Sequence, residues 1–162
     1  MTIVKHEILS TEPLKPFLKP MVVDLRNGLY LSQVMRGEVV TGLGDPATKP
    51  GIDQSSSLGF LAGIARALVT VMPALRHVKV VRQWAGMYDV TPDHVPILGP
   101  TPGFANFVQA NGFSGHGFMV SPMVAVLLAE VLAGAQPSMD LAPFDLGRFE
   151  RGELAPEAFI IG

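Results

Sequence analysis

The sequence predicts an α+β fold, in which a mostly antiparallel sheet is combined with two main helices. Short stretches rich in Val, Ile and aromatic residues are bounded by Gly, Pro and Asn, as is typical of strands. Two longer stretches carry apolar residues at helical spacing instead. The pair Asn27-Gly28 between two apolar runs is a strong hairpin signal. We expect residues 1–162 to form a single folded unit.

The strands are expected where the alternation is clearest. They cover residues 4–10, 38–42, 78–84 and 107–111, with shorter ones at 21–24 and 29–31 on either side of the Asn27-Gly28 turn. Pro13, Pro16 and Pro20 predict an extended connection after the first strand.

Two helices are expected at residues 55–72 and 118–133. In the first, Leu58, Leu61 and Leu68 fall on one face, a serine among residues 55–57 can cap the start, and Pro73 stops the helix. The second helix is strongly apolar, and Gly134 is its expected C-terminal stop.

Composition excludes several classes of protein. Hydrophobic residues make up 48% and charged residues 16%, which argues for a packed domain and for apolar surface covered by a partner or a further domain. The net charge of −2 gives no support for binding nucleic acid or anionic membranes. The absence of cysteine excludes disulfides, thiolate catalysis and cofactor attachment through sulfur. No signal segment or membrane span is visible, so we expect a cytoplasmic protein, and a homo-oligomer because of the apolar surface.

A glycine-rich turn at residues 112–117 lies between a strand and the second helix. Its glycines permit positive φ and close approach of a flat ligand, and the helix start presents unpaired N–H groups. This arrangement suits a ligand that becomes negatively charged during a reaction, and a phosphate would also fit. A tight turn without ligand is the plainer interpretation. The order of the glycines is not the dinucleotide-binding fingerprint.

Two runs together are more specific. The first is TPDHVPILG at residues 91–99 and the second is NGFSGHGF at residues 111–118, followed by the apolar helix. In this combination the chain resembles the flavin oxidoreductase family that includes D-amino-acid oxidase, glycine oxidase and sarcosine oxidase. Within that family it is most similar to sarcosine oxidase β subunits and related amino-acid dehydrogenases. The resemblance covers nearly the whole chain and is most specific over residues 84–134.

The resemblance implies the C-terminal portion of a two-domain flavoprotein. Residues 1–90 would be part of the substrate-binding domain and residues 91–150 the flavin-contacting segment. The family's N-terminal segment with Gly-x-Gly-x-x-Gly, which binds FAD, has no counterpart in the sequence. The implied partners are that missing FAD-binding segment or subunit and a small amine or amino acid. The implied reaction is oxidation of the C–N bond of a sarcosine-, glycine- or proline-like substrate by hydride transfer to FAD.

The resemblance also implies site residues. Catalytic roles fall to His116 and Tyr88, and substrate contacts to Tyr30, Gly44 and Tyr88. Cofactor contacts would come from a larger set: Gly86, Met87, Gly112, Ser114, Gly115, His116, Gly117, Phe118 and Met119. Gly86 stands where monomeric sarcosine oxidases carry the cysteine that binds flavin, so FAD would be held non-covalently. Met119 stands where those enzymes carry a lysine, and no metal site is expected.

Each candidate has a plainer interpretation. His116 is otherwise a surface turn histidine, Tyr88 a core aromatic, and the Asp93-His94 pair is structural rather than an acid–base pair. Trp84 is expected in the core. His6 and His77 are expected to be structural, and Asp45 and Asp53 to cap loops. For the whole chain, the alternatives are a truncated non-catalytic fragment and a small-molecule binding module that does not bind FAD alone.

Overall fold

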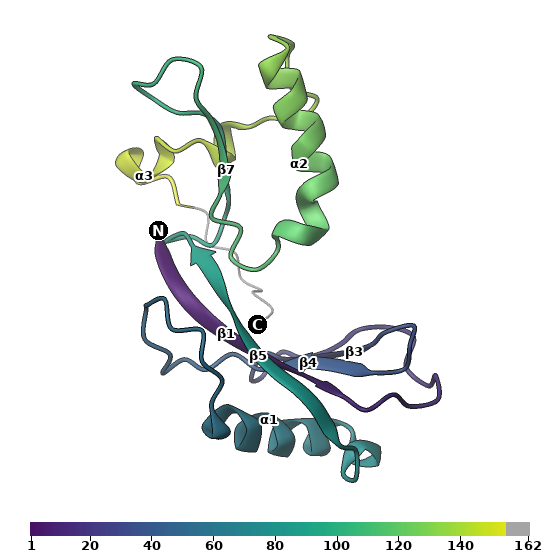
Figure 1. Cartoon of the computed structure of the whole chain (residues 1–162). Coiled ribbons are helices and arrows are strands. Elements are labelled where there is room, and N and C mark those ends of the chain that lie inside the picture. Colours follow the sequence, from purple (N-terminus) through teal and green to yellow (C-terminus); the bar gives the residue numbers. More distant parts are fainter. Residues whose placement is uncertain (155–162) are drawn as a thin grey trace. The chain divides into compact units, whose positions relative to one another are not determined.

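The computed structural model describes residues 1–154 and divides the chain into two compact units. Of the described residues, one unit comprises residues 4–87, and the other comprises residues 1–3 together with residues 88–154. Figure 1 shows both, and each is described by itself below. The fold is α+β, with two antiparallel sheets and helices, as the sequence predicted.

The first unit is built on a five-stranded sheet with the order β2-β3-β4-β1-β5. The strands are β1 (Thr2–Thr11), β2 (Val22–Asp24), β3 (Leu29–Gln33), β4 (Val39–Gly42) and β5 (Val80–Val90). The predicted hairpin joins β2 and β3, where Gly28 has φ +73° and donates its N–H to the Asp24 carbonyl at 2.9 Å. The Asn27 side chain accepts the Leu29 N–H, which fixes the turn.

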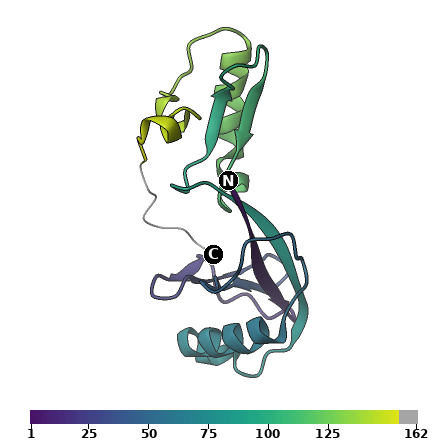
Figure 2. The ribbon, with the colours of Figure 1, turned by 90° about the vertical axis from the view of Figure 1, so that its left-hand side faces the viewer.

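Helix α1 (Leu58–Val71) lies across one face of this sheet, as both ribbon views show (Figures 1 and 2). The Ser57 hydroxyl caps the helix by accepting the Phe60 N–H at 3.0 Å. Pro73 begins the short helix η1 (Pro73–Leu75), which ends α1. The core of the unit lies between helix and sheet and consists of Leu9, Leu29, Leu31, Val39, Ile64, Leu68 and Leu75.

The second unit is smaller in regular structure. Strands β6 (Ile97–Pro100) and β7 (Val108–Asn111) form an antiparallel pair, and helix α2 (Gly117–Leu132) follows the glycine-rich turn. A short helix η2 (Ala142–Phe144) and a single-turn helix α3 (Arg148–Arg151) complete it. α2 is apolar on nearly all sides, yet only Leu127 is buried and the Phe118 side chain is 96% exposed.

Most sequence expectations for the elements are confirmed, with boundary shifts of one to three residues in the helices. The expected end of the fifth strand at Trp84 is wrong, because β5 runs on to Val90 through Gly86. Trp84 is half-buried rather than in the core, with the Arg82 guanidinium 5.1 Å from its ring centroid. Within residues 1–154, no helix is long and apolar enough to cross a membrane.

Candidate functional site

The glycine-rich turn before α2 has an unusual backbone. Gly112, Ser114 and Gly115 have φ values of +72°, +51° and +93°, all in the left-handed region. Such values are costly for Ser114, whose side chain is fully buried. A turn of this kind persists only where its surroundings hold it in place.

The amides at the start of α2 are partly open. The His116 N–H donates to the Phe113 carbonyl at 2.9 Å, so the expectation of an open amide there is wrong. The amides of Gly115, Gly117 and Phe118 have no acceptor among residues 1–154. Unpaired N–H groups and the positive end of the helix dipole both favour an acceptor or an anion at this position.

Two aromatic rings fill the space beside the glycines. A Cβ on Gly115 would lie 2.6 Å from the Tyr88 ring, and one on Gly117 would lie 3.2 Å from Phe113. The sequence argument assigned these missing side chains to a flat ligand, but protein rings occupy the space instead. Burial raises the pKa of the Tyr88 phenol, so it is protonated and able to donate a hydrogen bond at neutral pH.

The end of β5 anchors the turn through a residue that the sequence argument missed. The Asp89 carboxylate accepts the Gly112 N–H, and the Asp89 carbonyl accepts the Ser114 N–H at 3.2 Å. The only available signal was an acidic residue directly after the Met87-Tyr88 pair. Nothing in the local pattern indicates that its partner lies 23 residues further along the chain.

The turn at residues 91–95 is held by a buried ion pair. Arg148 donates from Nε to one oxygen of Asp93 at 2.8 Å and from Nη2 to the other at 3.0 Å. The two side chains are only 2% and 1% exposed. The hydrogen bond from Arg148 holds the pKa of Asp93 below its usual value. A carboxylate engaged in this way favours the structural interpretation over an acid–base role with His94.

His116 lies half-buried at the edge of an apolar cavity of about 360 Å³. The cavity lining includes Phe113, Met119, Met139 and Phe144. No hydrogen bond to the His116 imidazole is present in the described chain, so it lacks the carboxylate partner that commonly orients a general base. The Phe118 side chain points into solvent, since it is 96% exposed.

The remaining substrate candidates belong to the unit of residues 4–87. The Tyr30 ring lies across Gly42 of the next strand, where a Cβ would be 2.5 Å from the phenol oxygen. The Tyr30 hydroxyl is 3.3 Å from Nε2 of His6, and the two rings stack with their planes 18° apart. Burial lowers the pKa of His6, while the nearby Glu7 charge opposes this effect. His6 is thus the partner of a candidate substrate-binding residue.

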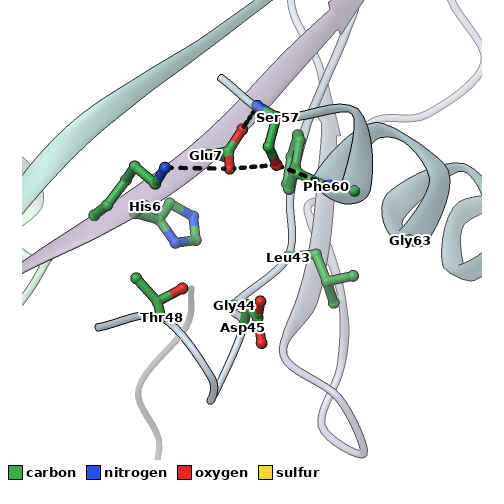
Figure 3. Close-up of a pocket in the computed structure, with 11 residues that line it drawn as sticks. His6, Glu7, Leu43, Gly44, Asp45, Thr48, Ser57, Phe60 and Gly63 are labelled. Carbon is green, nitrogen blue, oxygen red and sulfur yellow. Dashed lines mark hydrogen bonds and ion pairs between the residues drawn. The ribbon is translucent and has the colours of Figure 1, made fainter. Parts of the chain in front are cut away.

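Gly44 lines a polar cavity of about 200 Å³, which Figure 3 shows in close-up. Its charged groups are engaged with the protein itself. The Glu7 carboxylate accepts both the N–H and the hydroxyl of Ser57, at 2.7 and 2.9 Å, as the dashed lines in Figure 3 indicate. Lys5 pairs with Asp53 at 3.1 Å. This network therefore ties the loop before α1 to β1.

The loop aspartates act as expected. Asp45 accepts the Ala47 N–H at 2.9 Å. Asp53 accepts both the N–H and the hydroxyl of Ser55, and these bonds, with the one from Lys5, bring the pKa of Asp53 down to about 2. Both residues cap loop backbone.

Gly86 and Met87 lie on β5 directly before Tyr88. Gly86 is exposed, and a Cβ there would meet nothing within 4 Å. Tyr30, Gly44, Gly86 and Met87 fall in one unit, whereas Tyr88 and the glycine-rich turn fall in the other. The structure brings the second group together around the start of α2. In the described residues, no cluster of three His, Asp or Glu side chains is arranged to hold a metal ion.

Open amides at and just before a helix start have the chemistry to bind an anionic or electron-rich ligand. The sequence profile described as "FAD dependent oxidoreductase" matches residues 1–131. The chain belongs to this family, whose cofactor is FAD.

Individual relatives agree with the family assignment. The sarcosine oxidase subunit beta of Rhizobium meliloti is 35% identical over 147 residues, which are 91% of this chain and 35% of the relative. The hydrogen cyanide synthase subunit HcnC of Pseudomonas aeruginosa is 30% identical, again over 91% of this chain and 34% of its own length. The chain therefore spans about a third of the length of these curated relatives.

Solved structures also match. The L-proline dehydrogenase of P. horikoshii has a TM-score of 0.90 and 34% identity, covering 95% of this chain and 41% of that one. The glycine oxidase of Geobacillus kaustophilus has a TM-score of 0.81 and 26% identity, covering 91% and 40%. These similarities extend over both units of the chain.

Proposed function

We propose that this chain supplies part of the substrate side and one edge of the flavin site of an enzyme that oxidises the C–N bond of a small amine or amino acid. The observation that carries the proposal is the set of open amides at Gly115, Gly117 and Phe118, at the start of a long helix in a protein of an FAD-dependent family. Free N–H donors and the positive end of a helix dipole both stabilise the electron-rich edge of a flavin ring.

The residues fit the cofactor in three ways. The Gly115 and Gly117 amides offer donors that have no acceptor among residues 1–154. The Tyr88 ring packs beside Gly115 of the turn, and burial keeps its phenol protonated. The chain has no cysteine, so a bond to flavin through sulfur is excluded and FAD would be held non-covalently. When bound, FAD supplies the hydride acceptor for the oxidation, and the protein supplies position and charge.

On the substrate side, Tyr30, Gly44 and Tyr88 are the proposed contacts. A protonated phenol donates a hydrogen bond to a carboxylate without adding a charge. Gly44 leaves backbone exposed at the wall of the polar cavity. The names of the relatives, with sarcosine, glycine and L-proline among their substrates, support a small amino acid as the substrate.

His116 has a more limited proposed role. Its imidazole has no orienting partner in the described chain and borders an apolar cavity. Such a side chain can contact the cofactor or the substrate, and an orienting partner for proton transfer would have to come from elsewhere. Met119, 65% exposed on the first turn of α2, offers no charge to a carboxylate.

The apolar faces of α2 support a partner segment. Phe118, Met119 and Leu132 are 96%, 65% and 70% exposed, which is unusual for one short helix. The relatives are nearly three times as long as their matched part. We infer that the FAD-binding segment of the family, within the same or another chain, covers this helix. Self-association of the chain alone would cover it as well.

A second candidate function is a small-molecule binding module that does not use FAD. The apolar cavity of about 360 Å³ beside His116 favours it, because concave apolar space of this size suits a small ligand. This candidate predicts a colourless protein that binds apolar molecules in the absence of flavin.

The decisive experiment uses a chimera. The full chain replaces the aligned segment of the P. horikoshii L-proline dehydrogenase, with the unaltered dehydrogenase as control. We expect a yellow protein whose flavin absorption is bleached without oxygen by sarcosine, glycine or L-proline. A chimera that binds FAD but is reduced by no amine or amino acid would contradict the proposed reaction. A folded chimera that stays colourless with added FAD would contradict the flavin site.

A further inference from the structure

Asp89 is the residue on which the glycine-rich turn depends. It lies one residue before the end of β5, next to Tyr88, and both its side chain and its carbonyl accept hydrogen bonds from the turn. We propose that Asp89 is a positioning residue for the flavin edge, which sets where the open amides at the start of α2 point. The inference rests on the proposed function, because it concerns the same binding site.

The backbone of the turn gives the reason why an anchor is needed. Three of the four residues from Gly112 to Gly115 are left-handed, and one of them is a serine. A left-handed non-glycine residue costs about 1–2 kcal/mol, so the turn is strained unless other contacts hold it. Asp89 accepts one hydrogen bond from Gly112 and a second from Ser114, two residues later. The strained stretch is thus restrained at two positions by one residue.

Among the described residues, the Asp89 side chain forms a hydrogen bond with the turn from outside it. The Ser114 hydroxyl donates to the Gly112 carbonyl, and the His116 amide pairs with Phe113, so both of these bonds are internal. Thr91 and Tyr88 lie beside the turn, where a Cβ on Gly112 or Gly115 would clash with their side chains. Within residues 1–154, hydrogen bonds reach residues 112–116 from outside at Asp89 and, as helical bonds, from the Met119 and Val120 amides, which donate to the His116 carbonyl.

The geometry of the anchor connects it to the flavin site. Fixing Gly112 and Ser114 fixes the path of Gly115, whose positive φ directs the chain into α2. The Gly115 and Gly117 amides lie one and three residues beyond the Ser114 anchor. A loss of the anchor therefore changes the direction of the donors without removing any of them. The effect is on ligand affinity and orientation, since the donors themselves remain.

The first arm of the test measures amide exchange by NMR in the full 162-residue chain. In Asp89→Ala, exchange of the Gly112 amide should rise about tenfold or more, because a charged acceptor is lost. In Asp89→Asn, which retains an acceptor oxygen, it should stay within about threefold of the wild type. Asp140→Ala is the matched control, since Asp140 also accepts a backbone N–H, that of Ala142 at 3.0 Å, away from the turn.

The second arm measures FAD affinity of the chimera by flavin fluorescence. We expect Asp89→Ala to weaken FAD binding by about tenfold or more, Asp89→Asn to restore it to within about threefold, and Asp140→Ala to leave it unchanged. Restoration by Asn distinguishes positioning from general destabilisation. If Asp89→Ala fails to fold, Asp89→Asn still tests the inference, because this variant must bind FAD with nearly wild-type affinity.

Three results would overturn the inference. If Asp89→Ala leaves amide exchange at Gly112 unchanged, Asp89 does not anchor the turn. If exchange changes but FAD affinity does not, the anchor has no effect on the flavin site. If Asp89→Ala and Asp89→Asn weaken FAD binding equally, the hydrogen bonds to the Asp89 side chain do not explain the effect. A wild-type chimera that takes up no FAD is a different failure, since it removes the proposed function and the inference together.

Discussion

Replacing Arg148 with methionine should lower the free energy of unfolding by about 3–5 kcal/mol. The guanidinium is 2% exposed and donates twice to Asp93, at 2.8 and 3.0 Å, and once to the Val95 carbonyl at 2.7 Å. Methionine fills much of the same volume but donates nothing. The variant therefore leaves the Asp93 carboxylate, itself 1% exposed, buried without its cationic partner.

The assay is urea and thermal unfolding of the full chain, followed by circular dichroism. For a chain of this size, 1 kcal/mol corresponds to about 2–4 °C in Tm, so a fall of roughly 6–20 °C is expected. Arg151→Met is the matched control. Arg151 also forms ion pairs, with Asp145 at 2.8 Å and Glu153 at 2.7 Å, but it is 46% exposed. Exposed pairs contribute about 1 kcal/mol or less.

A loss below about 1 kcal/mol for Arg148→Met, equal to that of the control, would refute the reasoning. A second comparison uses Asp93→Val combined with Arg148→Met. Because this pair leaves no unpaired charge, the double variant should lose less than the sum of the two single variants. Strict additivity would show that the two charges do not depend on each other.

Three further predictions follow from particular contacts. Gly115→Ala should lower the free energy of unfolding in urea by several kcal/mol, because its Cβ would lie 2.6 Å from the Tyr88 ring. Gly134 is also left-handed, but a Cβ there would meet nothing within 4 Å, so Gly134→Ala should lower it by only about 1 kcal/mol. Equal costs would contradict this. The stabilisation due to the lowered pKa of Asp93 should be complete above its ordinary value of 3.8 and be lost as the pH falls below it, so unfolding free energies of wild type and Asp93→Asn should converge in acid. Gly42→Ala should displace the ring of Tyr30, whose hydroxyl would lie 2.5 Å from the new Cβ, and raise KM for the amino acid in the chimera more than it lowers kcat. An unaltered KM together with an unaltered near-ultraviolet tyrosine spectrum would argue that the ring does not move.

The fold was predictable where the determinants are local. The Asn27-Gly28 pair predicts the β2–β3 hairpin through backbone preferences alone, and Ser57 and Pro73 mark the ends of α1 for similar reasons. The β5 strand was predicted too short, since it was expected to end at Trp84 and in fact continues through Gly86 to Val90. In the sheet Gly86 is an exposed position where a missing side chain removes no contact.

The candidate site was predictable in its residues but not in their partners. The run from Gly112 to Gly117 was recognised from its glycines, and it does lead into α2. The roles of Asp89 and Arg148 depend on contacts across 23 and 55 residues, for which a single sequence holds no local signal. Likewise, the pairing of the His116 amide follows from the path of one turn. Composition and periodicity do not determine that path.

The Asp93–Arg148 pair also bears on where this protein can be cut. The match to the family ends at residue 131, and the arginine lies 17 positions beyond it. A fragment trimmed to the matched range would keep the acidic half of the pair and discard the basic half. Limited proteolysis within residues 133–147 should therefore separate Asp93 from Arg148 and destabilise the unit, whereas cleavage after Arg151 should keep both halves of the pair in one piece. The match to the family profile therefore ends before a residue on which the fold of this unit depends.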